Sequence, residues 1–146
     1  MQPANDPKNL DDELFARLAS NTPRPPIGKC VLIVGGHFLN IRLFDQLVQL
    51  QGCATIIIMG GDEGLQAAIK KPPDLIIVEA DGSNGFQLAR SLKGDERTRD
   101  IPLVVVSSHD ERTILRAGYE AYDVFVAKPI NVLNFLKMID GFLLPT

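Results

Sequence analysis

Short runs of apolar, mostly β-branched residues alternate with stretches of helical periodicity from Lys29 to the end of the chain. Apolar runs without polar alternation are typical of strands that are covered on both faces of a parallel sheet. They predict strands at residues 29–34, 54–59, 74–79, 102–107 and 123–127. The intervening and final stretches predict helices, the last of them capped by Asn131. Five strand–helix units with right-handed crossovers predict a doubly wound, five-stranded parallel α/β sheet.

The first 28 residues follow a different pattern. The stretch "NTPRPPIG" at residues 21–28 predicts a stiff, extended linker. Before it, an amphipathic helix is expected over residues 10–18, with Asn9 as its N-cap, either packed on its own domain or presented for docking. We therefore divide the chain into a helix-and-linker segment, 1–28, and a domain, 29–146. The apolar residues expected to share one side of the helix are Leu10, Leu14, Phe15 and Leu18.

Composition and charge narrow the function. The 146 residues are 45% hydrophobic and 23% charged, with a net charge of -3, which gives no general attraction to nucleic acid or to anionic membranes. No apolar run approaches the roughly 20 residues that span a bilayer. We expect a cytoplasmic protein. Cys30 and Cys53 show no zinc-type spacing, so no metal site and no cofactor are expected.

Two glycine-rich stretches suggest other functions. The stretch "GGDEG" at 60–64 is close to the signature of diguanylate cyclases, but here it joins a predicted strand to a helix instead of forming a hairpin. The stretch "VGGH" at 34–37 lacks the third glycine of a dinucleotide loop. Sensing of a small ligand or a nucleotide at the glycine-lined end of the sheet is therefore kept as an alternative function.

Three predicted strands carry a distinctive set of terminal residues. The third strand, "DLIIVE", ends on Glu79, the fourth lies in "IPLVVVSS", and the fifth leads into Lys128-Pro129 within "VFVAKPI". Together with the five strand–helix units, these residues resemble the receiver domain of bacterial two-component response regulators over residues 29–143. The resemblance implies a flavodoxin-like sheet of the receiver type.

The resemblance also implies roles for particular residues. Glu79 stands at the position of the phosphorylated aspartate, and Ser107, Phe125 and Lys128 stand at the family's switch positions. Gly35 and Gly36 replace the two acidic residues that hold magnesium in receivers. The loop after Glu79, "ADGSNGF", is about two residues shorter than the family's usual version.

These departures predict a degenerate receiver, or pseudo-receiver. Magnesium needs several oxygen ligands in near-octahedral geometry, and it neutralises the charge of a transferring phosphoryl group. Glutamate also places its carboxylate one methylene too far out, and roughly 1 Å of misplacement can cost about 100-fold in rate. We therefore expect no catalytic residues and no enzymatic activity. Glu79 is expected either to pair with Lys128, with Ser107 donating to its carboxylate, or to be solvated at the strand end.

The function predicted from these residues is that of a phosphorylation-independent protein–protein interaction module in bacterial signal transduction. Its expected partners are signalling proteins, such as a histidine kinase, another response regulator, or itself as a homodimer, and not nucleic acid or a membrane. A receiver that still accepts phosphate within a phosphorelay is a further alternative.

Overall fold

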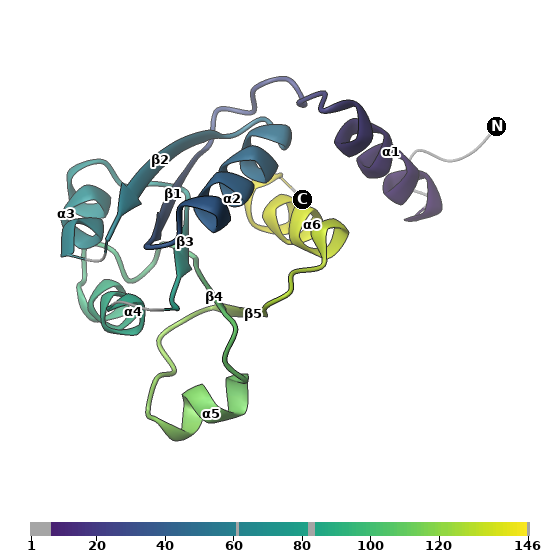
Figure 1. The fold of residues 1–146 in the computed structure, drawn as a ribbon. Coiled ribbons are helices and arrows are strands. Elements are labelled where there is room, and N and C mark those ends of the chain that lie inside the picture. Colours follow the sequence, from purple (N-terminus) through teal and green to yellow (C-terminus); the bar gives the residue numbers. More distant parts are fainter. Residues whose placement is uncertain (1–6, 61, 82–83, 146) are drawn as a thin grey trace.

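The computed structural model describes residues 7–60, 62–81 and 84–145, and Figure 1 shows a central sheet with helices on both sides. The strands are β1 (Cys30–Gly35), β2 (Ala54–Met59), β3 (Leu75–Glu79), β4 (Leu103–Ser107) and β5 (Val124–Ala127). The helices are α1 (Pro7–Ser20), α2 (Phe38–Leu50), α3 (Asp62–Lys70), α4 (Gly85–Gly94), α5 (Glu111–Arg116) and α6 (Val132–Leu143).

All neighbouring strands are parallel, and their order is β2-β1-β3-β4-β5. This confirms the predicted doubly wound sheet, whose observed strands agree with the expected ones to within a residue at each end. The predicted cap of α6 is also present, because the side-chain oxygen of Asn131 accepts a hydrogen bond from the Asn134 N–H at 3.0 Å. Helix α5 has only six residues and extends away from the sheet (Figure 1).

Two apolar cores separate the helices by sheet face. On one face, α2 and α6 pack on alternate strand residues, with the rings of Phe44 and Phe135 stacked at 5.5 Å. On the other face, α3 and α4 cover the remaining strand residues through Ala68, Leu88 and Leu92. Because β1, β3 and β4 are enclosed by both cores, their carboxyl ends are held rigidly relative to one another, and a site at that edge of the sheet is pre-organised.

Helix α1 packs beside α6 (Figure 1). Leu14 is fully buried in the first core, and the Arg17 guanidinium donates to the Leu50 carbonyl at 2.6 Å. Phe15, however, is 59% exposed and Leu10 is 40% exposed, so the expectation of a four-residue apolar side was wrong for these two. The helix also begins at Pro7, before the expected cap Asn9.

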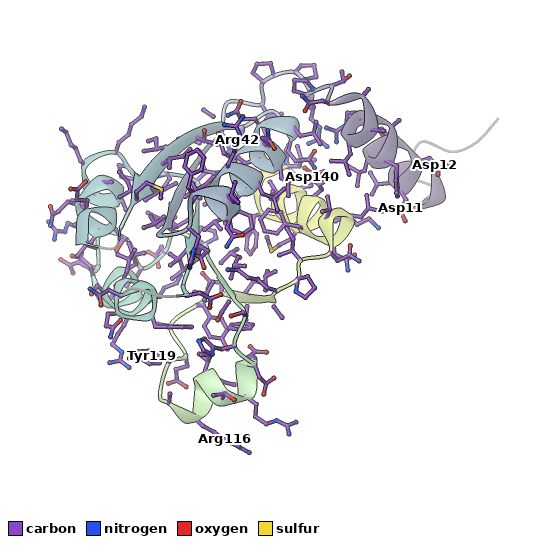
Figure 2. All side chains as sticks on the ribbon, viewed as in Figure 1. Asp11, Asp12, Arg42, Arg116, Tyr119 and Asp140 are labelled. Atoms are coloured by element: carbon purple, nitrogen blue, oxygen red, sulfur yellow. The ribbon has the colours of Figure 1, made fainter. Side chains whose placement is uncertain are left out.

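The segment after α1 is fixed to the domain. The Arg24 guanidinium forms two hydrogen bonds, at 2.8 and 2.9 Å, to the carboxylate of Asp140 on α6, which Figure 2 labels. The backbone N–H groups of Arg24 and Ile27 donate to the Leu50 and Gly52 carbonyls. Gly52 has a φ of 81° and closely faces the Pro25 carbonyl, where a Cβ atom would lie only 2.5 Å from the oxygen. Residues 24–27 are therefore seated on the end of α2.

Within the described residues, no helix combines the length and the apolar character needed to cross a membrane.

Replacing Leu14 by Ala is expected to lower the free energy of unfolding by about 2–5 kcal/mol, because a buried leucine is lost and a cavity remains. The neighbouring Phe15→Ala variant is the matched control and should change stability by no more than about 0.5 kcal/mol. Urea denaturation of both variants measures the difference. Equal losses in the two variants would contradict the packing of α1 described above.

Candidate functional site

The carboxyl ends of the central strands bring together the residues singled out in the sequence. Gly35 ends β1, Glu79 ends β3 and Ser107 ends β4, while Lys128 directly follows β5. The strand register places Glu79 opposite Val106, and Ser107 opposite Ala127. Ligands of doubly wound sheets bind at this edge.

Glu79 is buried at this edge and forms an ion pair. Its side chain is inaccessible to solvent, and its Oε2 atom lies 2.8 Å from Lys128 Nζ. The same oxygen accepts a hydrogen bond from the backbone N–H of Asp81 at 3.1 Å. The expected Glu79–Lys128 pair is thus present, and the alternative of a solvated strand-end acid is wrong.

Asp81 is the residue at this site that sequence reasoning missed. Its Oδ2 atom lies 2.9 Å from Lys128 Nζ, and its Oδ1 atom accepts a hydrogen bond from Ser107 Oγ at 2.7 Å. The Ser108 N–H also donates to the two carboxylate oxygens, at 3.1 and 2.9 Å. Ser107 was expected to donate to Glu79, and this was wrong: its hydroxyl donates to Asp81.

The contacts of Asp81 order the start of the connection from β4 to α5. The Ser107 hydroxyl donates to Asp81 and also accepts a hydrogen bond from the His109 N–H at 3.0 Å. Two consecutive backbone groups, those of Ser108 and His109, are therefore held by one short network. Asp110 follows as the residue preceding the first turn of α5.

Phe125 lies on β5 and packs, partly buried, against the second core. Its ring centroid is 5.6 Å from that of Tyr122, whose hydroxyl donates to Glu111 Oε2 on α5 at 2.6 Å. Burial and this hydrogen bond raise the pKa of Tyr122 to about 12. Phe125 is thus connected to α5 through one aromatic contact and one hydrogen bond.

Gly35 makes room for the glutamate. A Cβ atom at Gly35 would lie 2.8 Å from the Cβ of Glu79 and 2.6 Å from the Cδ1 of Ile41. Real Cβ atoms do not approach other atoms so closely, so a larger residue at this position requires a rearrangement of both Glu79 and Ile41. Gly36, by contrast, is exposed.

The charges of the site are set by these contacts. Burial disfavours the charged form of Asp81, but hydrogen bonds from Ser107, Lys128 and Ser108 outweigh this effect and hold its pKa well below the usual range. Burial also disfavours the charged form of Lys128, yet the hydrogen bonds to Glu79 and Asp81 raise its pKa. Both shifts favour the ionised pair at neutral pH.

Comparisons with known proteins agree with this architecture. Residues 31–140 match the response regulator receiver domain family. The polar-differentiation response regulator DivK of Brucella ovis is 36% identical over 121 residues, which cover 79% of this chain and 96% of the relative. Its counterpart in Brucella anthropi is 35% identical over the same coverage.

Solved structures show the same fold. The receiver domain of a signal transduction histidine kinase from Syntrophus aciditrophicus has a TM-score of 0.71 at 24% identity, and the alignment covers 80% of this chain and 90% of that one. The receiver domain of the sensor histidine kinase PA1611 from Pseudomonas aeruginosa, which was solved with magnesium in its active-site cleft, has a TM-score of 0.70 at 14% identity and covers 80% and 98%.

The five-stranded parallel sheet with helices on both faces, together with the family match, defines a receiver-type signalling domain. The chain belongs to the response regulator receiver domain family.

The residues present do not fit the magnesium ion that the family implies. Glu79 Oε2 and Asp81 Oδ2 both face the Lys128 ammonium, which repels a cation. The remaining oxygen of Glu79, Oε1, is buried without a hydrogen-bond partner among the described residues and faces the backbone of Gly35. One such oxygen cannot supply the several carboxylate and water ligands of an octahedral ion.

Replacing Lys128 by Met is expected to lower the free energy of unfolding by about 3–5 kcal/mol, because two carboxylates then remain close together without a counter-charge. Adding Asp81→Asn to this variant should recover part of the loss, since one of those charges is removed. Chemical denaturation at neutral pH measures both effects.

The Lys137→Met variant is the control for this prediction. Lys137 pairs with Asp11 between α6 and α1, and both side chains are more than a third exposed. Its replacement should cost no more than about 1 kcal/mol. If the two lysine variants lost equal stability, the ion pairs of Lys128 would contribute no more to the free energy of unfolding than an exposed ion pair does.

Proposed function

We propose that this chain is a degenerate receiver that acts without phosphorylation, as a protein–protein interaction module in bacterial signal transduction. The observation that carries the proposal is the Lys128 ammonium, which is shared by two carboxylates of the chain itself, Glu79 at 2.8 Å and Asp81 at 2.9 Å. In the family that this chain belongs to, the equivalent lysine contacts the phosphoryl group. Here that contact is already satisfied.

The electrostatics of the cleft oppose phosphoryl transfer. A phosphoryl donor would bring further negative oxygens to a place where, among the described residues, one ammonium alone pairs with two carboxylates. The glycines at 35 and 36 supply no metal ligand, and the space beside Gly35 is filled by Glu79 and Ile41. Glu79 is itself buried, with one oxygen on Lys128 and the other turned towards Gly35. It is poorly placed to attack a phosphorus atom.

The surface formed by α5, β5 and α6 is the proposed contact region for a partner. β5 is an edge strand of the sheet, and a groove of about 360 Å³ lies between it and α6. The groove is mostly apolar, with Phe125, Val126 and Met138 in its lining and Asn134 at its rim. A signalling protein such as a histidine kinase, another response regulator or a second copy of this chain is the proposed partner. The Brucella relatives, named as response regulators of polar differentiation, support a place in signalling.

Incubation with acetyl phosphate and magnesium is expected to leave the intact mass of the protein unchanged, because the cleft neither binds the metal nor presents a reactive carboxylate. A receiver with its acidic pair and aspartate intact serves as the positive control and should gain a phosphoryl group. A magnesium-dependent phosphoryl adduct on this chain would overturn the proposal.

The contact region is tested with Asn134→Arg, which places a large cation at the exposed rim of the groove. Binding of a partner, recovered by affinity capture from the source cell and then measured with purified components, is expected to weaken at least about tenfold. Gln66→Arg on the exposed face of α3, at the other edge of the sheet, is the matched control and should bind normally. Unchanged binding by Asn134→Arg, or an equal loss in both variants, would place the contact region elsewhere.

A further inference from the structure

Helices α1 and α5 each carry a large apolar side chain in solvent. Phe15 on α1 is 59% exposed and Leu115 on α5 is 46% exposed. Each follows the residue that anchors its helix, because Leu14 and Ile114 are buried in the domain. Adjacent residues on a helix point about 100° apart, so Phe15 and Leu115 remain outside the contacts that their neighbours make. The two helices therefore present two separate apolar contact points.

The side chains next to Phe15 are acidic. Asp11 and Asp12 precede it by four and three residues, a spacing that makes them its neighbours on the surface of α1. Asp11 pairs with Lys137 on α6 but is still 45% exposed, and Asp12 is exposed beside it. Figure 2 shows both aspartates at the end of α1 that is remote from the sheet. Phe15 thus lies within a negatively charged surface.

The side chains next to Leu115 are basic. Arg112 precedes it by three residues, and Arg116 lies one turn beyond Arg112, so the three share one side of α5. Both arginines are exposed, and Figure 2 shows Arg116 at the outer end of the molecule. The acid in the first turn of α5, Glu111, accepts the hydrogen bond from Tyr122. The exposed side of α5 is therefore positively charged around an apolar centre.

These two surfaces are complementary but too far apart to meet within one chain. Figure 1 shows α1 and α5 at opposite ends of the molecule, with α6 and β5 between them. Helix α1 packs on α6, while α5 is connected to β5 through Tyr122 and its contact with Phe125. A second copy related by a two-fold axis brings each α1 to the α5 of the other chain. Such an arrangement makes both contacts at once and leaves neither surface unpaired.

We propose that two copies of this chain form a symmetric dimer in which α1 of each chain binds α5 of the other. Phe15 packs on Leu115 of the partner subunit, and the two aspartates of α1 face the two arginines of the partner's α5. The inference rests on the proposed function, since it names a second copy of the chain as the partner at the surface that includes α5. It also gives a role to α1, which lies outside the residues 31–140 that match the receiver family.

Charge decides which helices pair. Contact between two α1 helices would bring the aspartates together, and contact between two α5 helices would bring the arginines together, so both arrangements place like charges opposite each other. The mixed contact pairs opposite charges around the two apolar side chains. Apolar area supplies most of the affinity of such a contact, whereas exposed charges supply orientation and are screened by salt. The dimer is therefore expected to form at low ionic strength and to weaken in high salt.

The oligomeric state of the full-length chain is the quantity to measure, by sedimentation equilibrium over a range of protein concentrations in low and high sodium chloride. The wild type is expected to be a dimer in low salt. Phe15→Ala removes an exposed side chain and leaves the fold unchanged, but it is expected to weaken the dimer at least about tenfold.

Charge reversal tests the pairing of the two helices. Asp12→Arg and the double variant Arg112→Glu/Arg116→Glu are each expected to lose the dimer, because each presents like charges to its own second copy. An equimolar mixture of the two variants should form a one-to-one heterodimer. In that heterodimer one α1–α5 contact is the wild-type one, and the other has the charge of both helices changed, so that opposite charges meet again.

Glu63→Arg and Lys70→Glu/Lys71→Glu are the matched controls for these reversals. The three side chains are exposed on α3 or directly after it, and Figure 1 shows α3 on the side of the sheet away from α1. Both control variants are expected to dimerise like the wild type in low salt.

A monomeric wild type in low salt would overturn the inference, as would charge-reversed variants that dimerise normally or a mixture that stays monomeric. Association beyond the dimer at rising concentration would indicate an open chain of molecules and would also refute it. If the α1 and α5 variants have no effect while Asn134→Arg still weakens binding of another signalling protein, this inference falls and the proposed function stands. A magnesium-dependent phosphoryl adduct on a wild type that dimerises as described would refute the proposed function and leave the dimer in place.

Discussion

The Lys128 ammonium is the interaction on which the carboxyl edge of the sheet depends. It lies within 3 Å of two carboxylates, of which Glu79 is fully enclosed and Asp81 nearly so. Both acids depend on this counter-charge, because burial of an unpaired carboxylate costs several kcal/mol. The ammonium therefore fixes the end of β3, the connection that follows it and, through Asp81, the first residues after β4.

The glutamate at the end of β3 and the glycine at the end of β1 are linked by packing. The space that a side chain at Gly35 would need is occupied by Glu79 and Ile41, at 2.8 and 2.6 Å from an ideal Cβ atom. An aspartate at position 35 would thus require both Glu79 and Ile41 to shift, and a shift of Glu79 disturbs the residue that pairs with Lys128. The glycine at position 35 and the glutamate at position 79 look like independent departures from the receiver pattern in the sequence. In the fold they are sterically coupled. Restoring a single acidic residue would not rebuild a metal site.

The sheet was predictable because its signal is local. Each buried strand is a continuous apolar run, and the residue at its end, such as Glu79, is automatically at the ligand-binding edge. Asp81 was not predictable in this way, since no periodicity determines the direction of a side chain in a loop. The available signal for a second acid at the site was the shortened loop, which has an aspartate two residues after Glu79. Phe15 was misassigned because adjacent apolar residues on one helix point about 100° apart, and of these two neighbours only Leu14 is buried against the domain.

The connection between the cleft and the surface is covalent and short. Three residues separate Ser107 from the start of α5. The first amide, that of Ser108, donates to the Asp81 carboxylate, and the second, that of His109, donates to the Ser107 hydroxyl, which itself donates to Asp81. Beyond α5, the chain is held by the Tyr122–Glu111 hydrogen bond and by the ring of Tyr119, labelled in Figure 2, which lies tilted against that of Phe86 with the centroids 5.2 Å apart. Helix α5 has six residues, is held at both ends and makes few contacts along its length. The order of this surface therefore depends on those end contacts. A carboxylate that is always present keeps one end fixed, where an exchangeable phosphoryl group would fix it only intermittently. Such an arrangement suits a domain that offers one constant surface to its partner.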